Sequence, residues 1–120
     1  MLNPDGVING NYRCSLAGCD LNRRWKTPNK ILQPTIYHVK KLVKDLKVER
    51  GCLMFCDLHG HSRKQNVFMY GCNKKDAPAW CRMFPYLLSK VNGFFKFADS
   101  RFGVQKSKEA TARVAMFKEL

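Results

Sequence analysis

Two histidines, His59 and His61, follow directly after a short apolar run at residues 52–58. A neutral imidazole can bind a metal ion or transfer a proton near neutral pH. Six of the seven residues in the run are apolar and a turn signal follows, so the pattern predicts a buried strand. Ligands of open α/β sheets bind just beyond the carboxyl ends of strands, where both histidines would lie. From the histidines alone, a pair of polar loop residues is an equally good interpretation.

The rest of the chain alternates between helical and extended patterns. Residues 1–11 read as a loop, because Asn, Gly, Pro and Asp dominate them, and residues 23–33 form a second irregular stretch. A helix is expected to start at Pro34 and to end before Gly51. Two more are expected from Pro78 to about Val91, with a break or kink at Pro85, and over residues 107–118 with Ser107 as a possible cap. Extended segments are expected over residues 67–70, 94–97 and 102–104. The alternation predicts an α/β fold with a mixed central sheet flanked by helices.

The helix expected after Pro34 carries lysines at positions 40, 41, 44 and 47. Apolar residues at helical spacing occupy its other side, so the simplest interpretation of the lysines is a solvated face. The six cysteines form no paired CxxC units of a structural zinc site and no secretion signal opens the chain, so we expect reduced thiols. Cys14 and Cys19 flank a glycine-containing turn, and Cys52 and Cys56 fall in the expected buried strand.

The chain is strongly basic, with a formal net charge of +13. Such an excess attracts polyanions, namely nucleic acid, an anionic membrane or an acidic protein tail. The basic residues are dispersed, however, and no nucleic-acid-binding motif accompanies them. Hydrophobic and charged fractions of 45% and 26% are those of an ordinary globular protein. No apolar run reaches the length of a membrane span and no signal peptide is present, which predicts a soluble intracellular protein.

Four motifs occur in a fixed order along the chain: Asn3-Pro4-Asp5-Gly6, Gly18-Cys19-Asp20-Leu21-Asn22-Arg23-Arg24-Trp25, Asp57-Leu58-His59-Gly60-His61-Ser62-Arg63-Lys64 and Asn66-Val67-Phe68-Met69-Tyr70-Gly71. Together they resemble the zinc carboxypeptidases, and specifically the cytosolic carboxypeptidases. That family is best known for removing glutamates from the acidic tails of tubulin. The resemblance extends from Asn3 to about Lys118, nearly the whole chain.

The resemblance implies a zinc site of which this chain holds one ligand. His59 matches the family's ligand at the end of a strand, whereas His61 matches no ligand and is expected to line the pocket. The upstream HxxE motif, which supplies the other two ligands, is absent. The family's general-base glutamate is also absent, since Glu119 lies too close to Arg113 to match it. A single imidazole does not hold catalytic zinc tightly, so the chain alone is expected to be inactive.

The resemblance implies a more complete substrate-binding set. Asn22 and Arg23 match the residues that bind the terminal carboxylate of a peptide, which a guanidinium recognises through paired hydrogen bonds. Arg13 matches the arginine that polarises the scissile carbonyl and stabilises the developing oxyanion. Arg113 matches the position in the specificity pocket where a cation selects an acidic side chain.

These matches predict a partial zinc carboxypeptidase catalytic domain over residues 1–120, truncated at both ends. The expected setting is cytoplasmic, and the expected partners are acidic peptide or protein tails such as those of tubulin, with no membrane. Two alternatives stay open. One is a non-catalytic remnant that binds acidic C-termini, and the other, less favoured, is a basic nucleic-acid-binding protein.

Overall fold

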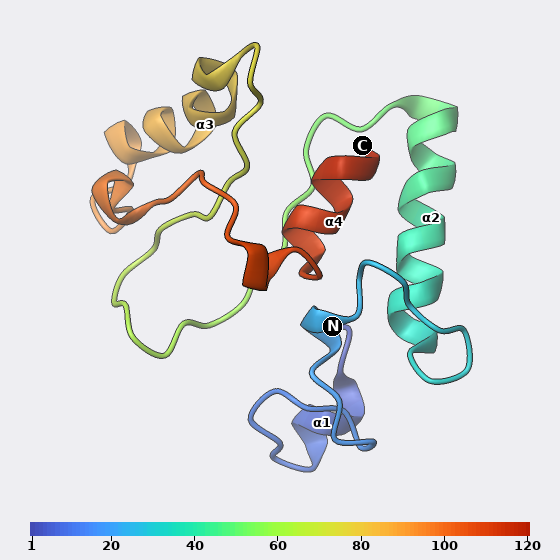
Figure 1. Ribbon diagram of the computed structural model, residues 1–120. Coiled ribbons are helices and arrows are strands. Elements are labelled where there is room, and N and C mark those ends of the chain that lie inside the picture. Colours follow the sequence, from blue (N-terminus) through green and yellow to red (C-terminus); the bar gives the residue numbers. More distant parts are fainter. The chain divides into compact units, whose positions relative to one another are not determined.

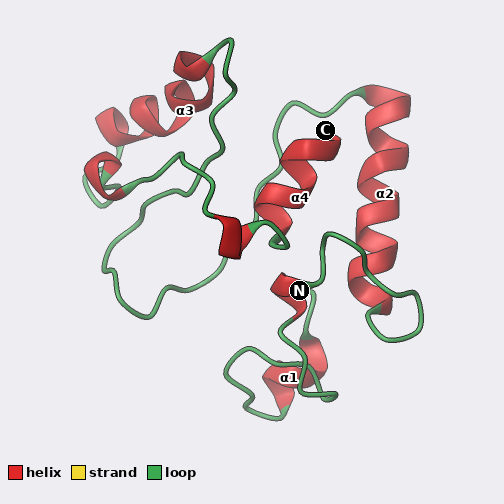
Figure 2. Ribbon diagram, viewed as in Figure 1, coloured by secondary structure: helices red, strands yellow, loops and turns green.

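The computed structural model describes all 120 residues, which divide into two compact units. Unit 1 comprises Met1–Phe55 together with Lys106–Leu120, and unit 2 comprises Cys56–Gln105. The regular structure consists of the helices α1 to α4 and three single turns of 3₁₀ helix (Figure 1). None of the helices is long and apolar enough to span a membrane. Figure 2 shows helices and loops only, so the expected mixed central sheet is not seen here.

The first helix, α1, spans Pro4–Ile8 and corrects the expectation of a loop over residues 1–11. The Asn3 side chain caps it by accepting a hydrogen bond from the backbone N–H of Gly6, and Pro4 occupies the first helical position. Asn3 also donates its side-chain amide to the carbonyl of Cys14 at 3.1 Å. This one asparagine therefore starts the helix and fastens it to the following loop.

The second helix, α2, spans Pro34–Arg50 and confirms the prediction made from its two ends. Pro34 opens it, and Gly51 ends it with a φ of +76°, a value that favours glycine. Ile36 is buried and contributes to the core of unit 1. Val39 and Val43, one and two turns further along, pack against the same core.

The last helix, α4, spans Ala112–Glu119, and a separate 3₁₀ turn at Lys106–Lys108 precedes it. Ser107 is therefore not its cap, contrary to expectation. Thr111 occupies the capping position, but its hydroxyl donates to the carbonyl of Lys108 at 2.7 Å instead of accepting a helix N–H. The first N–H of α4, at Ala112, therefore needs a hydrogen-bond acceptor from another part of unit 1.

The core of unit 1 joins residues from both of its chain segments. Trp25 lies at its centre with 2% of its surface exposed, and its backbone N–H donates to the carbonyl of Ala110 at 3.1 Å. Phe55 approaches Trp25 edge-on, with ring centroids 5.9 Å apart. The buried members of this cluster are Leu21, Trp25, Ile36, Ala112, Ala115 and Met116.

The expectation of a solvated lysine face on α2 is wrong for Lys40, which is buried, and holds for Lys41 and Lys44, which are exposed. Lys40 is buried, and its ammonium donates to the carbonyls of Trp25 and Lys26 at 2.7 and 2.9 Å. Glu119 completes this site by pairing with Lys40 and Lys44, each at 2.7 Å. Lys47 donates to the Glu119 carbonyl at 2.8 Å. Lys41 is exposed and pairs with Asp45 of the same helix.

Unit 2 is built on α3, which spans Pro78–Val91 as expected and continues through Pro85 without ending there. Beside it, residues 67–73 and 94–102 share backbone hydrogen bonds of 2.7–3.1 Å, and the 3₁₀ turn Phe97–Asp99 interrupts the second stretch. Their pairing is limited to two isolated parallel bridges, Val67 with Phe95 and Tyr70 with Arg101. Of the three expected extended segments, residues 67–70 and 94–97 contain bridged residues, whereas residues 102–104 contain none and Phe97 already belongs to a 3₁₀ turn. Two short segments also lack the third strand that usually stabilises a sheet.

The predicted buried strand over residues 52–58 is wrong for this structure. The segment forms no ladder, and Leu53, Met54 and Leu58 expose 105%, 58% and 89% of their surfaces. Cys52 and Cys56 are exposed as well, although all six cysteines are free as expected. A strand needs a partner on at least one side, and no other segment of the chain pairs with this one.

Candidate functional site

A tight hairpin in unit 1 brings Arg13 opposite Asp20. Cys14 and Asp20 form an antiparallel bridge, and the backbone N–H of Ser15 donates to the carbonyl of Cys19 at 3.0 Å. Gly18 closes the turn with a φ of +67°, which a glycine adopts without strain. The hairpin leaves Arg13 Nε 3.4 Å from Asp20 Oδ2, with about half of the arginine side chain exposed.

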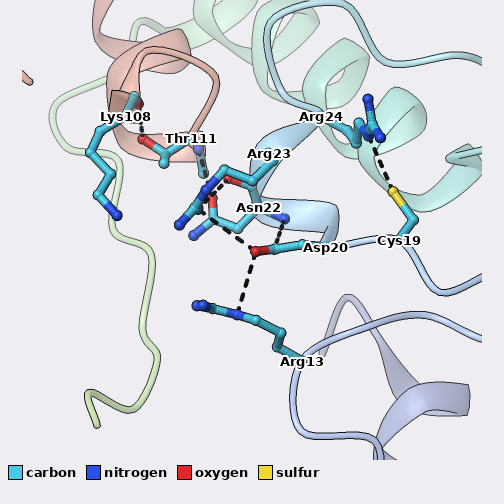
Figure 3. A network of polar contacts seen from close by, with 9 residues as sticks. Arg13, Cys19, Asp20, Asn22, Arg23, Arg24, Lys108 and Thr111 are labelled. Atoms are coloured by element: carbon cyan, nitrogen blue, oxygen red, sulfur yellow. Dashed lines mark hydrogen bonds and ion pairs between the residues drawn. The ribbon is translucent and has the colours of Figure 1, made fainter. Parts of the chain in front are cut away.

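Asp20 also holds the two residues that follow Leu21. Its Oδ1 accepts the backbone N–H of Asn22 at 3.0 Å, which caps the 3₁₀ turn Leu21–Arg23. Its Oδ2 lies 4.0 Å from a terminal nitrogen of Arg23. Figure 3 shows the carboxylate of Asp20 between Arg13 on one side and Asn22 and Arg23 on the other. One acidic side chain therefore gathers three of the predicted site residues.

Asn22 connects this cluster to the start of α4. Its side-chain oxygen accepts the N–H of Ala112 at 2.8 Å, a contact across 90 positions of sequence. Asn22 thereby supplies the cap that Thr111 does not provide. Arg113, the next residue of α4, is half-buried. Four of the predicted residues, Arg13, Asn22, Arg23 and Arg113, therefore lie on one connected framework within unit 1.

An open hollow of about 520 Å³ adjoins the cluster on the hairpin side. Arg13 lines it together with neighbouring residues of the hairpin, which are Asn11, Tyr12, Cys14, Ser15, Leu16 and Gly18. The guanidinium carbon of Arg13 lies 5.9 Å from the ring centre of Tyr12, within cation–π range. A cation that is half exposed at a concave surface is well placed to meet an anionic ligand.

The two histidines belong to unit 2. His59 is half exposed, and its Nδ1 lies 3.6 Å from a carboxylate oxygen of Asp57. His61 accepts the backbone N–H groups of Arg63 and Lys64 with its Nδ1, both at 3.1 Å. Its ring also contacts Phe68, with centroids 5.3 Å apart. The expectation that His59 and His61 share a cleft with the arginines stays a prediction.

The residues present do not make a complete metal site. Nowhere in the chain do three His, Cys, Asp or Glu side chains come together in a group that could hold a metal ion. His59 has one carboxylate neighbour, Asp57, whereas a catalytic zinc site requires three protein ligands and an open position. The described side chains can therefore supply one ligand of a zinc site, His59, but not a complete site.

Asp20 is the residue of this cluster that sequence reasoning missed. It lies within a motif that carries the family resemblance, but the motif by itself gives it no role. A signal was available, because an aspartate two residues before Asn22 is the usual partner of a backbone N–H at the start of a turn. Its ion pair with Arg13 depends on the hairpin and could not be read from spacing.

The sequence matches curated proteins over essentially its whole length, although no family model matches it. It is 51% identical to cytosolic carboxypeptidase 1 of Danio rerio and 50% identical to that of Homo sapiens, in both cases over all of the chain. It is 54% identical to cytosolic carboxypeptidase 2 of Xenopus tropicalis over 99% of the chain. The chain belongs to the cytosolic carboxypeptidase family. It spans 12%, 11% and 13% of the length of these three cytosolic carboxypeptidases, respectively.

A solved structure supports the same family at the level of the fold. This cytosolic carboxypeptidase segment superposes on a carboxypeptidase A-like protein from Shewanella denitrificans with a TM-score of 0.78 and 28% sequence identity. The match covers 98% of the segment and 33% of that protein. Almost every residue of the segment therefore follows a carboxypeptidase-like fold, even though its extended parts form only isolated bridges.

Proposed function

We propose that this segment forms the substrate-binding part of a zinc carboxypeptidase of the cytosolic type. The proposed substrates are acidic protein tails that end in glutamate or carry side-chain-linked glutamates, such as those of tubulin. The proposed setting is the cytoplasm. The observation that carries the proposal is the framework of Arg13, Asn22, Arg23 and Arg113, assembled around Asp20 and the start of α4.

The chemistry of this framework suits a peptide with a free C-terminus. Arg13 and Arg23 offer guanidinium groups, which bind carboxylates through charge-assisted and often paired hydrogen bonds. Because Asn22 caps α4, Arg113 is held at a defined place relative to Arg23. A terminal carboxylate at Arg23 and an acidic side chain at Arg113 would give the selectivity for glutamate that we propose.

Zinc enters the proposal as the metal of the whole enzyme, with His59 as its ligand in this segment. When bound, zinc would supply an activated water for peptide hydrolysis. Since the residues present provide no complete site, we assign to them only substrate binding and one metal ligand. We therefore expect the 120-residue chain by itself to hydrolyse no peptide.

A second candidate function is peptide binding without catalysis. It rests on the same framework, since the contacts that hold Arg13, Asn22 and Arg23 together require no metal ion. A nucleic-acid-binding role remains the weaker alternative, and it rests only on the net charge of +13.

The proposal is tested by measuring the affinity of the chain for three polyanions at fixed salt. These are a glutamate-ending peptide with a free C-terminal carboxylate, the same peptide with an amidated C-terminus, and a random DNA duplex. We expect the free acid to bind about tenfold more tightly than the amide, because the amide lacks one charge-assisted contact. Equal affinity for free acid and amide would contradict the proposal, and tightest binding to the duplex would favour the nucleic-acid role.

A further inference from the structure

Asp20 is the shared counter-ion of two arginines. Arg13 and Arg23 carry like charges and both lie within 4.0 Å of the same oxygen atom, Asp20 Oδ2. Without a counter-ion, two such cations would repel each other and their flexible side chains would separate. The side chain of Asp20 is 24% exposed, so water screens this contact less than it would on an open surface.

The contact with Arg13 leaves the ligand-binding end of that side chain accessible. Asp20 approaches Nε, and Figure 3 shows the terminal nitrogens of Arg13 to one side of this contact. Arg23 is held at one of its two terminal nitrogens. The nitrogen that lies 4.0 Å from Asp20 Oδ2 also donates to the carbonyl of Asn22 at 3.0 Å. Arg13 is thus restrained at Nε, and Arg23 keeps its second terminal nitrogen outside these two contacts.

The second oxygen of Asp20 acts on the backbone. By accepting the N–H of Asn22 at 3.0 Å, it sets the turn from which the Asn22 side chain reaches Ala112. The same carboxylate pairs with both arginines through its other oxygen. A single acidic group therefore orders Arg13, Asn22 and Arg23 together.

We infer that Asp20 is a positioning residue for recognition of the peptide's terminal carboxylate, an inference that rests on the proposed function. Asp20 fixes the directions of the two guanidinium groups, so that they recognise the geometry of a carboxylate. Two unrestrained arginines would attract any anion and discriminate poorly. Asp20 therefore contributes to selectivity between anions more than to affinity for them.

The test compares Asp20→Asn with Asp45→Asn. Asparagine at position 20 keeps an oxygen that can accept the Asn22 N–H but removes the charge. Asp45→Asn removes the same charge from an exposed ion pair of α2, away from the cluster, and controls for net charge. For each variant, the ratio of the affinities for the free-acid and amidated glutamate peptides is measured by calorimetry, with Asp20→Glu as the variant that restores the charge.

We expect Asp20→Asn to reduce this ratio about tenfold while affinity for the amidated peptide is kept, as for loss of one charge-assisted contact. Asp20→Glu should recover part of the ratio, and Asp45→Asn should leave it unchanged. An unchanged ratio in Asp20→Asn would overturn the inference. An equal loss of affinity for both peptides would also overturn it, because a merely structural role has that result.

A second measurement detects the Arg13–Asp20 ion pair in the absence of peptide. In the NMR spectrum, the Nε–H proton of Arg13 should exchange with water more slowly in the wild-type chain than in Asp20→Asn, and equal exchange would overturn the inference. The proposed function fails if the wild-type chain does not prefer the free-acid peptide. The inference about Asp20 fails if the wild type shows this preference and Asp20→Asn keeps it, so the two failures are distinguishable.

Discussion

The side-chain oxygen of Asn22 accepts the first N–H of α4, at Ala112, across 90 positions of sequence. A helix cap is usually supplied by the residue just before the helix, here Thr111, whose hydroxyl is engaged with Lys108. The long-range cap means that the residue predicted to bind the substrate carboxylate also determines where α4 begins. The proposed carboxylate-binding residue and the position of Arg113 are therefore linked through one amide group.

Replacement of Asn22 should accordingly reduce stability as well as binding. We expect Asn22→Ala to lower the free energy of unfolding by about 1–2 kcal/mol, the usual cost of losing a helix cap. Asn22→Asp, which keeps an acceptor at the same place, should cost less. Urea denaturation measures both, with Asn9→Ala as the control, since the side chain of Asn9 makes only an exposed contact with the carbonyl of Asp5. Equal stability of Asn22→Ala and wild type would show that the cap is not formed in solution.

Gly6 should be sensitive to the addition of a single methyl group. A Cβ at this position would lie 2.4 Å from the carbonyl oxygen of Cys14 and closer still to Asn3, so the loop that carries Arg13 would have to shift. We expect Gly6→Ala to lower the free energy of unfolding by about 1–3 kcal/mol, as overpacking generally does. Gly60→Ala, where a Cβ would meet nothing within 4 Å, is the control. Thermal unfolding that is identical for both variants would contradict the packing described for α1.

The pairing of Glu119 with α2 should make stability depend on acid pH. Burial by itself opposes ionisation of Glu119, but hydrogen bonds from Lys40 and Lys44 outweigh it and hold the pKa of this carboxyl below its ordinary value of 4.5. A lowered pKa in the folded state contributes stability above pH 4.5 that is lost as the pH falls through the folded pKa.

Glu119→Gln should therefore be less stable than wild type near pH 7, and the difference should shrink as the pH falls below about 4.5. Urea midpoints between pH 3 and pH 7 measure this, with Asp45→Asn as the control for an exposed pair. A difference between Glu119→Gln and wild type that stays constant across this range would indicate that the carboxylate charge does not stabilise the helix pair.

Specificity is best examined in a chimera in which this chain replaces the matching segment of Xenopus tropicalis cytosolic carboxypeptidase 2. Arg113→Ala should lower kcat/KM for glutamate-ending peptides far more than for apolar-ending ones, because only an acidic side chain pairs with the guanidinium. Arg23→Ala should lower kcat/KM about a hundredfold for every substrate, since all share the terminal carboxylate. Equal losses across substrates for Arg113→Ala would make it a structural residue, and Arg50→Ala, on the exposed end of α2, is the control.

The isolated chain should bind zinc weakly and release no glutamate. His59 is the one expected ligand present, and a tetrahedral site requires more. Dialysis against a mild chelator followed by metal analysis measures retention, and peptide incubation measures release. Stoichiometric zinc that survives dialysis, together with glutamate release, would contradict the assignment of a single ligand.

The helices could be predicted from sequence because their signals are local. Pro34 and Gly51 mark the ends of α2, and Pro78 marks the start of α3. The strand over residues 52–58 could not be predicted reliably, because an apolar run reports only a preference for burial and a strand also needs partner segments. The extended segments expected in unit 2 are confirmed only in part, because residues 67–70 and 94–97 contribute isolated bridges and residues 102–104 contribute none.

In the candidate site, likewise, residues could be named from local motifs, whereas their long-range contacts could not be predicted. Arg13, Asn22, Arg23 and Arg113 were named from motifs, and the contacts of Asp20 and Asn22 join them within unit 1. The burial of Lys40 was missed because its partners, Trp25, Lys26 and Glu119, are far from it in sequence. A lysine is normally expected at the surface, and only the folded chain reveals such a set of acceptors.

Unit 1 is discontinuous, since residues 56–105 separate its two segments. During synthesis on the ribosome, the first segment emerges without Ala112, Ala115 and Met116, so Trp25 and Ile36 have no complete core to enter. The ammonium of Lys40 likewise lacks its carboxylate partner, Glu119, until α4 has been synthesised. The framework of Arg13, Asn22, Arg23 and Arg113 is therefore complete only after α4 has left the exit tunnel, and until then the apolar residues of the first segment are open to aggregation.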